Sequence, residues 1–195
     1  MNISEIEKIT RHYDKYFQQD NCIVLHPKEA KLHIDAVLYA PTEHYPFWKF
    51  ATVGACDHKM KGKNSLSNRN EYMLFIDPSV DMNDKLTAIK YYDLLVKTAL
   101  FPYYNNTLIS YGHSLEFADE NLTGVVGAFL ELPQAIDDTG ILRCKLSMFK
   151  KVAFLQVIPL DKQALEQLLK VGNEEFSYTY AYPDDDKESH WLCKL

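Results

Sequence analysis

The sequence predicts an α+β domain whose centre is a mixed, largely antiparallel sheet flanked by helices. Helical segments near the start, in the middle and late in the chain are separated by several strand-like runs, without strict alternation of strand and helix. Two of those runs are almost continuously apolar, which is typical of central strands covered on both faces. The chain has 195 residues, of which 47% are hydrophobic and 25% charged, so we expect residues 1–195 to form one domain with its own core.

The N-terminal segment predicts an amphipathic helix over residues 3–18. Ser4 and Glu7 have the spacing of a capping box. Isoleucine, tyrosine and phenylalanine then recur at helical spacing as far as Phe17, with charged residues on the other side. We expect this helix to lie on the sheet with its apolar face.

Strand signals follow between residues 32 and 76. Residues 32–39 alternate in polarity, and a turn with two prolines separates them from a second strand over residues 47–53. A third strand is expected over residues 71–76, where an Asp-Pro pair ends it. The first two strands are expected to pair as a hairpin.

The second half of the chain predicts two helices and the two central strands. A largely buried helix is expected from residue 85 to residue 100, ended by Pro102 because proline cannot continue a helical hydrogen-bond ladder. The continuous apolar runs 124–132 and 152–158 are the expected central strands. A last helix is expected within residues 161–172, with an aspartate at its start and a glycine at its end.

Net charge indicates which kind of partner to expect, and cysteine spacing indicates which cellular compartment. The formal net charge is −6, which argues against a nucleic-acid partner and suits a basic protein partner. An acidic C-terminal tail over residues 184–195 adds to this charge. Four widely spaced cysteines predict free thiols, and the absence of a secretion-signal core or a membrane-length apolar run predicts a cytoplasmic protein without a membrane partner.

The stretch from Leu32 to Met60 holds more polar residues suited to catalysis or binding than any other stretch of the chain. Cys56, with His58 or His113 as its base, has the composition of a thiol active site. The alternative is that Cys56 is a small residue packed in a tight corner.

Two further groups permit both a functional and a structural interpretation. His33 and Asp35, at positions i and i+2 of a strand, can ligate a metal if His58 or His113 supplies a third ligand; otherwise they form a buried hydrogen bond between strands. Gly112 and His113, followed by a serine, can seat an anion on backbone amides or simply form a turn.

Several segments together resemble the Suppressor-of-fused (SUFU) family. The segment HIDAVLYAPTEHYPFWKFATVGACDHKM is similar to the opening motif of that family, and EYMLFID, the Gly-His-Ser element and VAFLQVIPLDKQALEQLLKVG are similar to later elements in the same order. Together the matches span about residues 25–175. The matching positions of the opening motif are His33, Asp35, Pro41, Thr42, Glu43, Pro46, Phe47, Trp48, Thr52, Gly54, Asp57 and Met60.

The resemblance implies a SUFU-like α+β domain of the bacterial single-domain type, without an established catalytic activity. It implies a non-enzymatic protein-binding function, which for the bacterial type is an immunity protein or antitoxin that neutralises a basic, nuclease-type toxin. No cofactor is expected, and Cys56 stands where the family pattern has serine, which weakens the thiol-enzyme alternative. The motif residues expected to serve structure or binding are His33, Asp35, Thr42, Glu43, Trp48, Gly54, Asp57, Met60, Gly112 and His113.

Overall fold

The computed structural model describes residues 1–27, 32–62, 66–117, 122, 124–182 and 190–195. The strands are β1 (Ile23–Leu25), β2 (Asp35–Tyr39), β3 (Trp48–Val53), β4 (Asn70–Ile76), β5 (Ser114–Glu116), β6 (Gly127–Glu131), β7 (Arg143–Lys145), β8 (Lys151–Leu160) and β9 (Leu192–Cys193). The α-helices are α1 (Ile3–Phe17), α2 (Lys85–Asn105), α3 (Lys162–Val171) and α4 (Asn173–Phe176). Short helical turns are η1 (Ala55–Asp57), η2 (Thr139–Leu142) and η3 (Ser177–Ala181).

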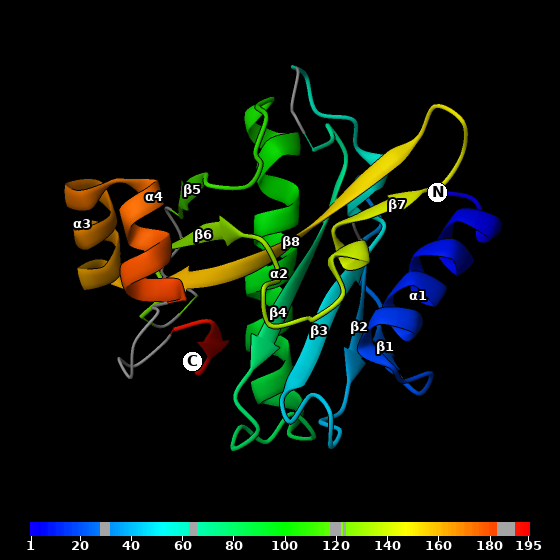
Figure 1. Ribbon diagram of the computed structural model, residues 1–195, viewed down its shortest axis with the longest axis horizontal. Helices are drawn as coiled ribbons and strands as arrows, with labels where there is room; N and C mark the ends of the chain where they lie inside the picture. The colour runs from blue at the N-terminus through cyan, green and yellow to red at the C-terminus, as the bar shows by residue number, and fades with distance from the viewer. Residues whose placement is uncertain (28–31, 63–65, 118–121, 123, 183–189) are drawn as a thin grey trace.

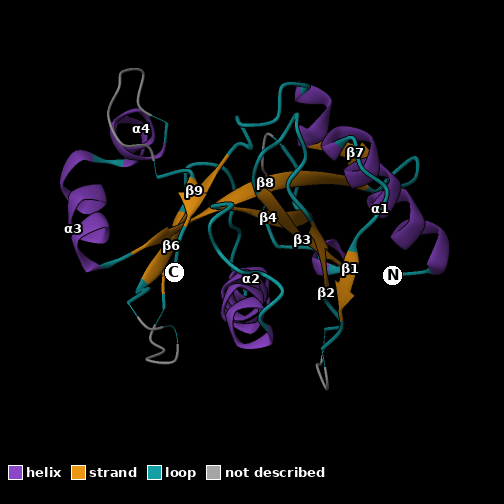
Figure 2. Cartoon of the chain, turned by 90° about the horizontal axis from the view of Figure 1, so that it is seen from below, coloured by secondary structure: helices purple, strands orange, loops and turns teal. Residues whose placement is uncertain are grey.

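All of these strands belong to one sheet with helices on both faces (Figures 1 and 2). The strand order is β1-β2-β3-β4-β8-β6-β5, with β7 paired to β8 and β9 paired to β4. Only the pairs β4–β8 and β4–β9 are parallel among the described strands, and the other pairs are antiparallel. The predicted α+β class with a mixed, largely antiparallel sheet is therefore confirmed.

Strand β4 is the centre of the sheet, and each of its residues is buried. It pairs with β3 along one side; on the other it pairs first with β8, through residues 70–73, and then with β9, through residues 75–76. Its side chains alternate between two cores: Tyr72, Leu74 and Ile76 pack on the α2 face, and Met73 and Phe75 on the α1 face. This alternation is what the period of two in a strand requires when both faces are covered.

Helix α2 covers one face of the sheet, as Figure 2 shows. Its N-terminus is capped by Asp84, whose carboxylate accepts a hydrogen bond from the Thr87 amide at 2.8 Å. The prediction that Pro102 ends this helix was wrong, because Pro102 is buried inside the last turn and its carbonyl accepts hydrogen bonds from the Asn106 and Thr107 amides. A proline at this position still forfeits one hydrogen bond of the ladder, and the burial of its ring outweighs that loss. No helix in the described part of the chain combines the length and apolarity needed to cross a membrane.

Helix α1 lies on the opposite face, near β2, β3 and β7 (Figure 2). Its buried side chains are Ile9, Tyr13 and Phe17, and the Tyr13 hydroxyl donates a hydrogen bond to the Thr52 carbonyl at 2.9 Å. The predicted helix over residues 3–18 is therefore nearly right in extent, and a buried polar contact adds to its apolar packing.

The predicted capping box of α1 was displaced by two residues. Asn2, rather than Ser4, is the N-cap: its side chain accepts from the Glu5 amide at 2.9 Å, and the Glu5 carboxylate accepts from the Asn2 amide at 3.3 Å. Asparagine and glutamate provide the same reciprocal pairing as the predicted Ser4–Glu7 box.

The C-terminal part of the chain is more structured than the sequence suggests. Helix α3 begins after the Asp161 cap and ends at Gly172 as predicted, but α4 and the η3 turn follow it. The interpretation of residues 184–195 as a tail was wrong for its last part, because β9 pairs with β4 and Cys193 is buried. Residues 183–189, which hold the aspartates of that tail, lie outside the described residues.

Replacement of Leu94 by alanine tests the core beneath α2. Leu94 is fully buried, so Leu94→Ala should lower the free energy of unfolding by about 2 to 5 kcal/mol through lost transfer energy and a residual cavity. The exposed Leu86 on the same helix is the matched control, and Leu86→Ala should change stability by less than about 0.5 kcal/mol. Urea unfolding followed by circular dichroism measures both values, and equal losses would contradict this packing.

Candidate functional site

The corner between β3 and β4 is organised by the buried carboxylate of Glu71. Its Oε1 accepts hydrogen bonds from the amides of Gly54 (3.0 Å) and Cys56 (3.1 Å). Its Oε2 accepts from the Thr52 hydroxyl (2.6 Å) and the Ala55 amide (3.2 Å). Four donors thus surround a carboxylate that has no exposed surface. We name this arrangement, Glu71 with residues 52–57, the Glu71 corner.

Gly54 allows the chain to reach the carboxylate. Its φ angle is +120°, and an added Cβ would lie 2.4 Å from the His33 carbonyl oxygen. A side chain there would be strained and would clash with the backbone, so only glycine fits this position. The family-motif glycine therefore has a steric role.

Burial raises the pKa of Glu71, and the hydrogen bonds from Thr52 and Cys56 oppose that rise. Because each carboxylate oxygen faces two donors, the geometry fits the ionised form, which only accepts hydrogen bonds. The carboxylate is enclosed by its own turn and does not face a space where a substrate would bind.

Arg69 completes the Glu71 corner from the opposite side. One guanidinium nitrogen donates to the carbonyls of Cys56 at 2.7 Å and Asp57 at 2.8 Å. The Asp57 carboxylate in turn lies 2.8 Å from the Met1 ammonium and 3.3 Å from Lys150 Nζ. The hydrogen bond from that ammonium lowers the pKa of Asp57. Asp57 therefore joins α1 and the β7–β8 hairpin to the corner.

The Cys56 thiol is packed inside this corner. It is fully buried, and its sulfur lies 3.5 Å from the Met1 sulfur. Burial, and then the Glu71 carboxylate, raise the pKa of Cys56, which keeps the thiol protonated. The hydrogen bonds of the described residues place neither His58 nor His113 on the thiol: His58 lies against the Tyr103 ring with centroids 5.3 Å apart. The structure does not assemble the predicted thiol site.

The motif residues of the β2–β3 connection hold a turn. The Thr42 hydroxyl accepts from the Tyr45 amide at 3.0 Å, and the Tyr45 carbonyl accepts from the Thr42 amide at 2.9 Å. Trp48 donates its indole N–H to the Val80 carbonyl at 3.1 Å. Glu43 is exposed on the same turn.

The remaining motif residues lie apart from the Glu71 corner. Met60 is buried, and its sulfur accepts a contact from the Ile109 amide at 3.5 Å. Gly112 has a φ of +76° and precedes the exposed His113, whose carbonyl accepts from the Leu130 amide at 2.8 Å. This geometry is that of a turn that starts β5, so the turn interpretation of this element is supported.

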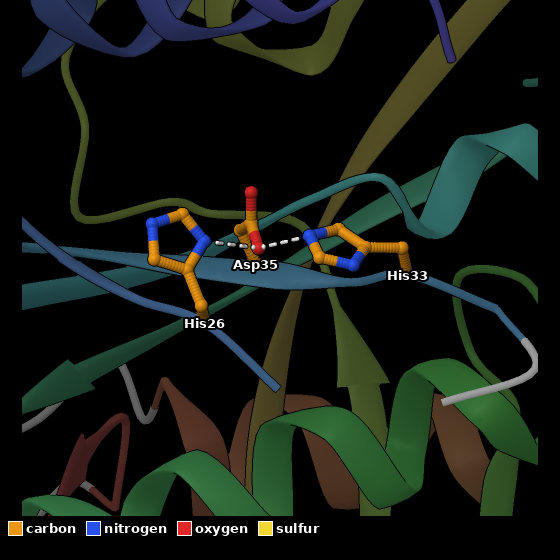
Figure 3. Close-up of side chains that lie close together, drawn as sticks. All are labelled: His26, His33 and Asp35. Carbon is orange, nitrogen blue, oxygen red and sulfur yellow. Dashed lines mark hydrogen bonds and ion pairs between the residues drawn. The ribbon is translucent and has the colours of Figure 1, made fainter. Parts of the chain in front are cut away.

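The predicted pair His33 and Asp35 lies at the sheet edge, where the structure adds His26 (Figure 3). Neither His58 nor His113 is part of this group, so the predicted third ligands were wrong. The alternative of a His–Asp hydrogen bond to a neighbouring strand is partly right: His26 and His33 both contact Asp35, but the histidine side chains are exposed and the bonds are not buried. Among the described residues, these three side chains are the one group of histidine, cysteine or acidic residues placed to hold a metal ion.

Sequence reasoning missed Arg69, His26 and the central role of Glu71. The available signal for Glu71 was a charged residue at the start of an otherwise apolar strand, since such a residue needs buried partners. His26 gives no signal of its own, because only the strand register brings it to Asp35.

The fold and the Glu71 corner together define an α+β domain whose main buried polar group serves architecture. The family model described as "Suppressor of fused protein (SUFU)" matches residues 30–182, and the chain therefore belongs to the Suppressor of fused family. Among curated proteins, no significant match to this sequence is found.

Solved structures of the same family have the same fold. A SUFU homologue from Neisseria gonorrhoeae FA 1090 is 11% identical with a TM-score of 0.67, and the match covers 100% of both chains. The Sufu–Fu complex structure is 12% identical with a TM-score of 0.61, covering 88% of this chain and 82% of that one. Drosophila Suppressor of Fused is 11% identical with a TM-score of 0.61, covering 89% of this chain but 46% of the longer fly protein. The family resemblance predicted from the sequence is confirmed.

Replacement of Glu71 by glutamine tests the corner. In glutamine an NH2 donor replaces one carboxylate oxygen, and that donor would face a backbone N–H donor. Glu71→Gln should therefore cost about 1 to 3 kcal/mol of unfolding free energy. Glu43→Gln is the control, because Glu43 is a motif glutamate with an exposed side chain. Denaturant titrations measure both, and a Glu71→Gln variant as stable as the control would refute the structural role.

Alkylation tests the state of Cys56. A buried, protonated thiol reacts slowly, so iodoacetamide at pH 8 should modify Cys56 far more slowly than the partly exposed Cys22 and Cys144. In denaturant the three rates should converge. Peptide mass spectrometry measures each site, and rapid native labelling of Cys56 would contradict its burial and revive the thiol-enzyme alternative.

Proposed function

We propose that this chain is a non-enzymatic protein-binding domain, and specifically an immunity protein that neutralises a basic, nuclease-type toxin in the cytoplasm. Membership of the Suppressor of fused family carries the proposal, since the family model matches residues 30–182. A structural relative, crystallised as the Sufu–Fu complex, is a protein bound to another protein. A binding role for this chain follows by analogy with that relative.

The chemistry of the Glu71 corner supports a role without catalysis. Glu71 is enclosed by the donors of its own turn, and the Cys56 thiol is buried and protonated. A general base or nucleophile must reach its substrate within hydrogen-bond distance, and both of these groups are fully buried. The two strongest candidates for chemistry therefore stabilise the fold.

The β1 edge of the sheet offers a surface for a partner. Strand β1 stands at one end of the strand order and pairs with β2, and its Ile23 and Val24 side chains are exposed. An extended partner segment can add to such an edge through main-chain hydrogen bonds, with apolar contacts for specificity. Exposed apolar side chains on a short edge strand suit this mode of binding better than they suit a free surface.

The charge of the chain favours a basic partner. A net charge of −6 would accelerate encounter with a positively charged nuclease, and salt would screen the attraction. The basic surface of such a partner would face this acidic protein. The same negative charge hinders association with other acidic proteins.

The experiment uses the C-terminal domain encoded by the reading frame adjacent to this gene. We expect the purified chain to bind that domain, to inhibit its nuclease activity, and to lose affinity as salt is raised from 50 to 500 mM, a range of about one decade. Ile23→Asp with Val24→Asp should weaken binding at least about tenfold, because two charges replace the apolar edge. Isothermal titration calorimetry measures the affinity.

Leu169→Asp is the matched control, since Leu169 is an exposed apolar side chain on α3, far along the sheet from β1 (Figure 1). Circular dichroism verifies that each variant is folded. Failure of the unmodified chain to bind or inhibit the neighbouring domain would count against the immunity role. Equal affinity of the edge variant and the control would reject β1 as the contact.

A further inference from the structure

His26, His33 and Asp35 meet at one end of the β1–β2 pair. Asp35 is the first residue of β2, and His33 precedes it by two residues, so both point to the same side of the strand. The β1–β2 register pairs Leu25 with Ala36, and its next step places His26 opposite Asp35. Directly opposed residues of an antiparallel pair share a face. The strand register therefore brings together three residues whose spacing in the sequence matches no metal-binding motif.

Both imidazoles contact the same carboxylate oxygen. His26 Nδ1 lies 2.9 Å and His33 Nε2 lies 2.8 Å from Asp35 Oδ1. Figure 3 shows the rings on either side of the carboxylate, and their centroids are 6.3 Å apart. One ligand atom from each residue can be chosen so that all three lie within 4.8 Å of one another.

These distances are close to those of a metal site. Metal–ligand bonds of about 2.1 Å in a tetrahedron place ligand atoms roughly 3.4 Å apart. The observed nitrogen–oxygen separations of 2.8 and 2.9 Å would need to widen by about half an ångström. Exposed histidine side chains can make such a movement through small χ rotations.

The site is open on the histidine side and anchored on the carboxylate side. The side chains of His26 and His33 are 65% and 67% exposed, whereas that of Asp35 is 13% exposed. The backbone of Asp35 is also held from the other side, by its pairing with Val53 in β3. An ion from solvent can therefore reach the imidazoles without unfolding the sheet.

We propose that His26, His33 and Asp35 bind a divalent transition-metal ion, with Zn²⁺ as the best match, and that the ion ties β1 to β2. Two imidazole nitrogens and one carboxylate oxygen form a three-ligand zinc set that leaves a fourth position for water. The ion joins His26, directly after β1, to Asp35 at the start of β2, and so secures a three-residue edge strand. The ion is expected to bind here whether or not the proposed toxin partner is present.

Untagged protein, stripped with a chelator, is titrated with Zn²⁺ by calorimetry and with Co²⁺ by visible absorption. We expect one ion per chain, visible Co²⁺ bands typical of a four-coordinate site with nitrogen and oxygen ligands, and a higher melting temperature in Zn²⁺. His26→Ala and His33→Ala should each weaken Zn²⁺ binding at least about tenfold and abolish the thermal shift. Affinity should fall as the pH is lowered, because protons compete for the imidazole nitrogens.

His44→Ala is the matched control. His44 is another exposed histidine beside an aspartate, 3.1 Å from Asp137, but within the described part of the chain no second histidine contacts that carboxylate. This variant should bind Zn²⁺ as the unmodified chain does. Asp35→Asn is a second test, which should remove the anionic ligand while both imidazoles remain.

The proposal is overturned if stripped protein takes up no stoichiometric Zn²⁺. It is also overturned if His26→Ala and His33→Ala bind as tightly as His44→Ala, since the three side chains would then be only a hydrogen-bonded group. Because these measurements contain no toxin domain, their failure leaves the immunity proposal standing, and failure of toxin binding leaves the metal site standing.

Discussion

The rest of the structure depends on one interaction, the hydrogen bonding of the buried Glu71 carboxylate to its four donors. A charge removed from water costs several kcal/mol unless it is satisfied, so the chain must deliver all four donors to it. Delivery of those donors requires the left-handed Gly54, the η1 turn and the close approach of β3 to β4. Arg69 and Asp57 then extend the same constraint to the N-terminus of α1 and to β8.

Because of this constraint, the polar stretch that first suggests chemistry stabilises the fold. The residues of the Glu71 corner use their hydrogen-bonding capacity on one another, and Cys56 is sealed beneath them. Substitution of cysteine for a smaller polar serine is tolerated in such a place, because a buried thiol behaves as a small apolar group. The surfaces proposed for contact with other molecules, the edge strand β1 and the histidines beside it, accordingly lie on the outside of the domain.

Local patterns predicted those parts of the fold that depend on nearby residues. The sequence predicts the apolar strands β4 and β8 and both ends of α3. These features are predictable because periodicity and capping act within a few positions. Strands β1, β5, β7 and β9 have three residues or fewer, too short for any period to show. Pro102 was misjudged because its burial outweighed a local penalty. The roles of Glu71 and His26 depend on donors and ligands brought close by strand pairing, which no local window contains.

The metal site and the proposed partner surface meet at the same strand. An ion held by His26, His33 and Asp35 would restrict β1, whose Ile23 and Val24 are the apolar groups offered to a partner. A strand ordered in advance has less entropy to lose on binding, so the ion and the partner would favour each other's association. Such coupling is reciprocal, since each ligand must change the affinity of the other by the same factor. The sheet edge would then be a binding surface whose readiness depends on the available metal.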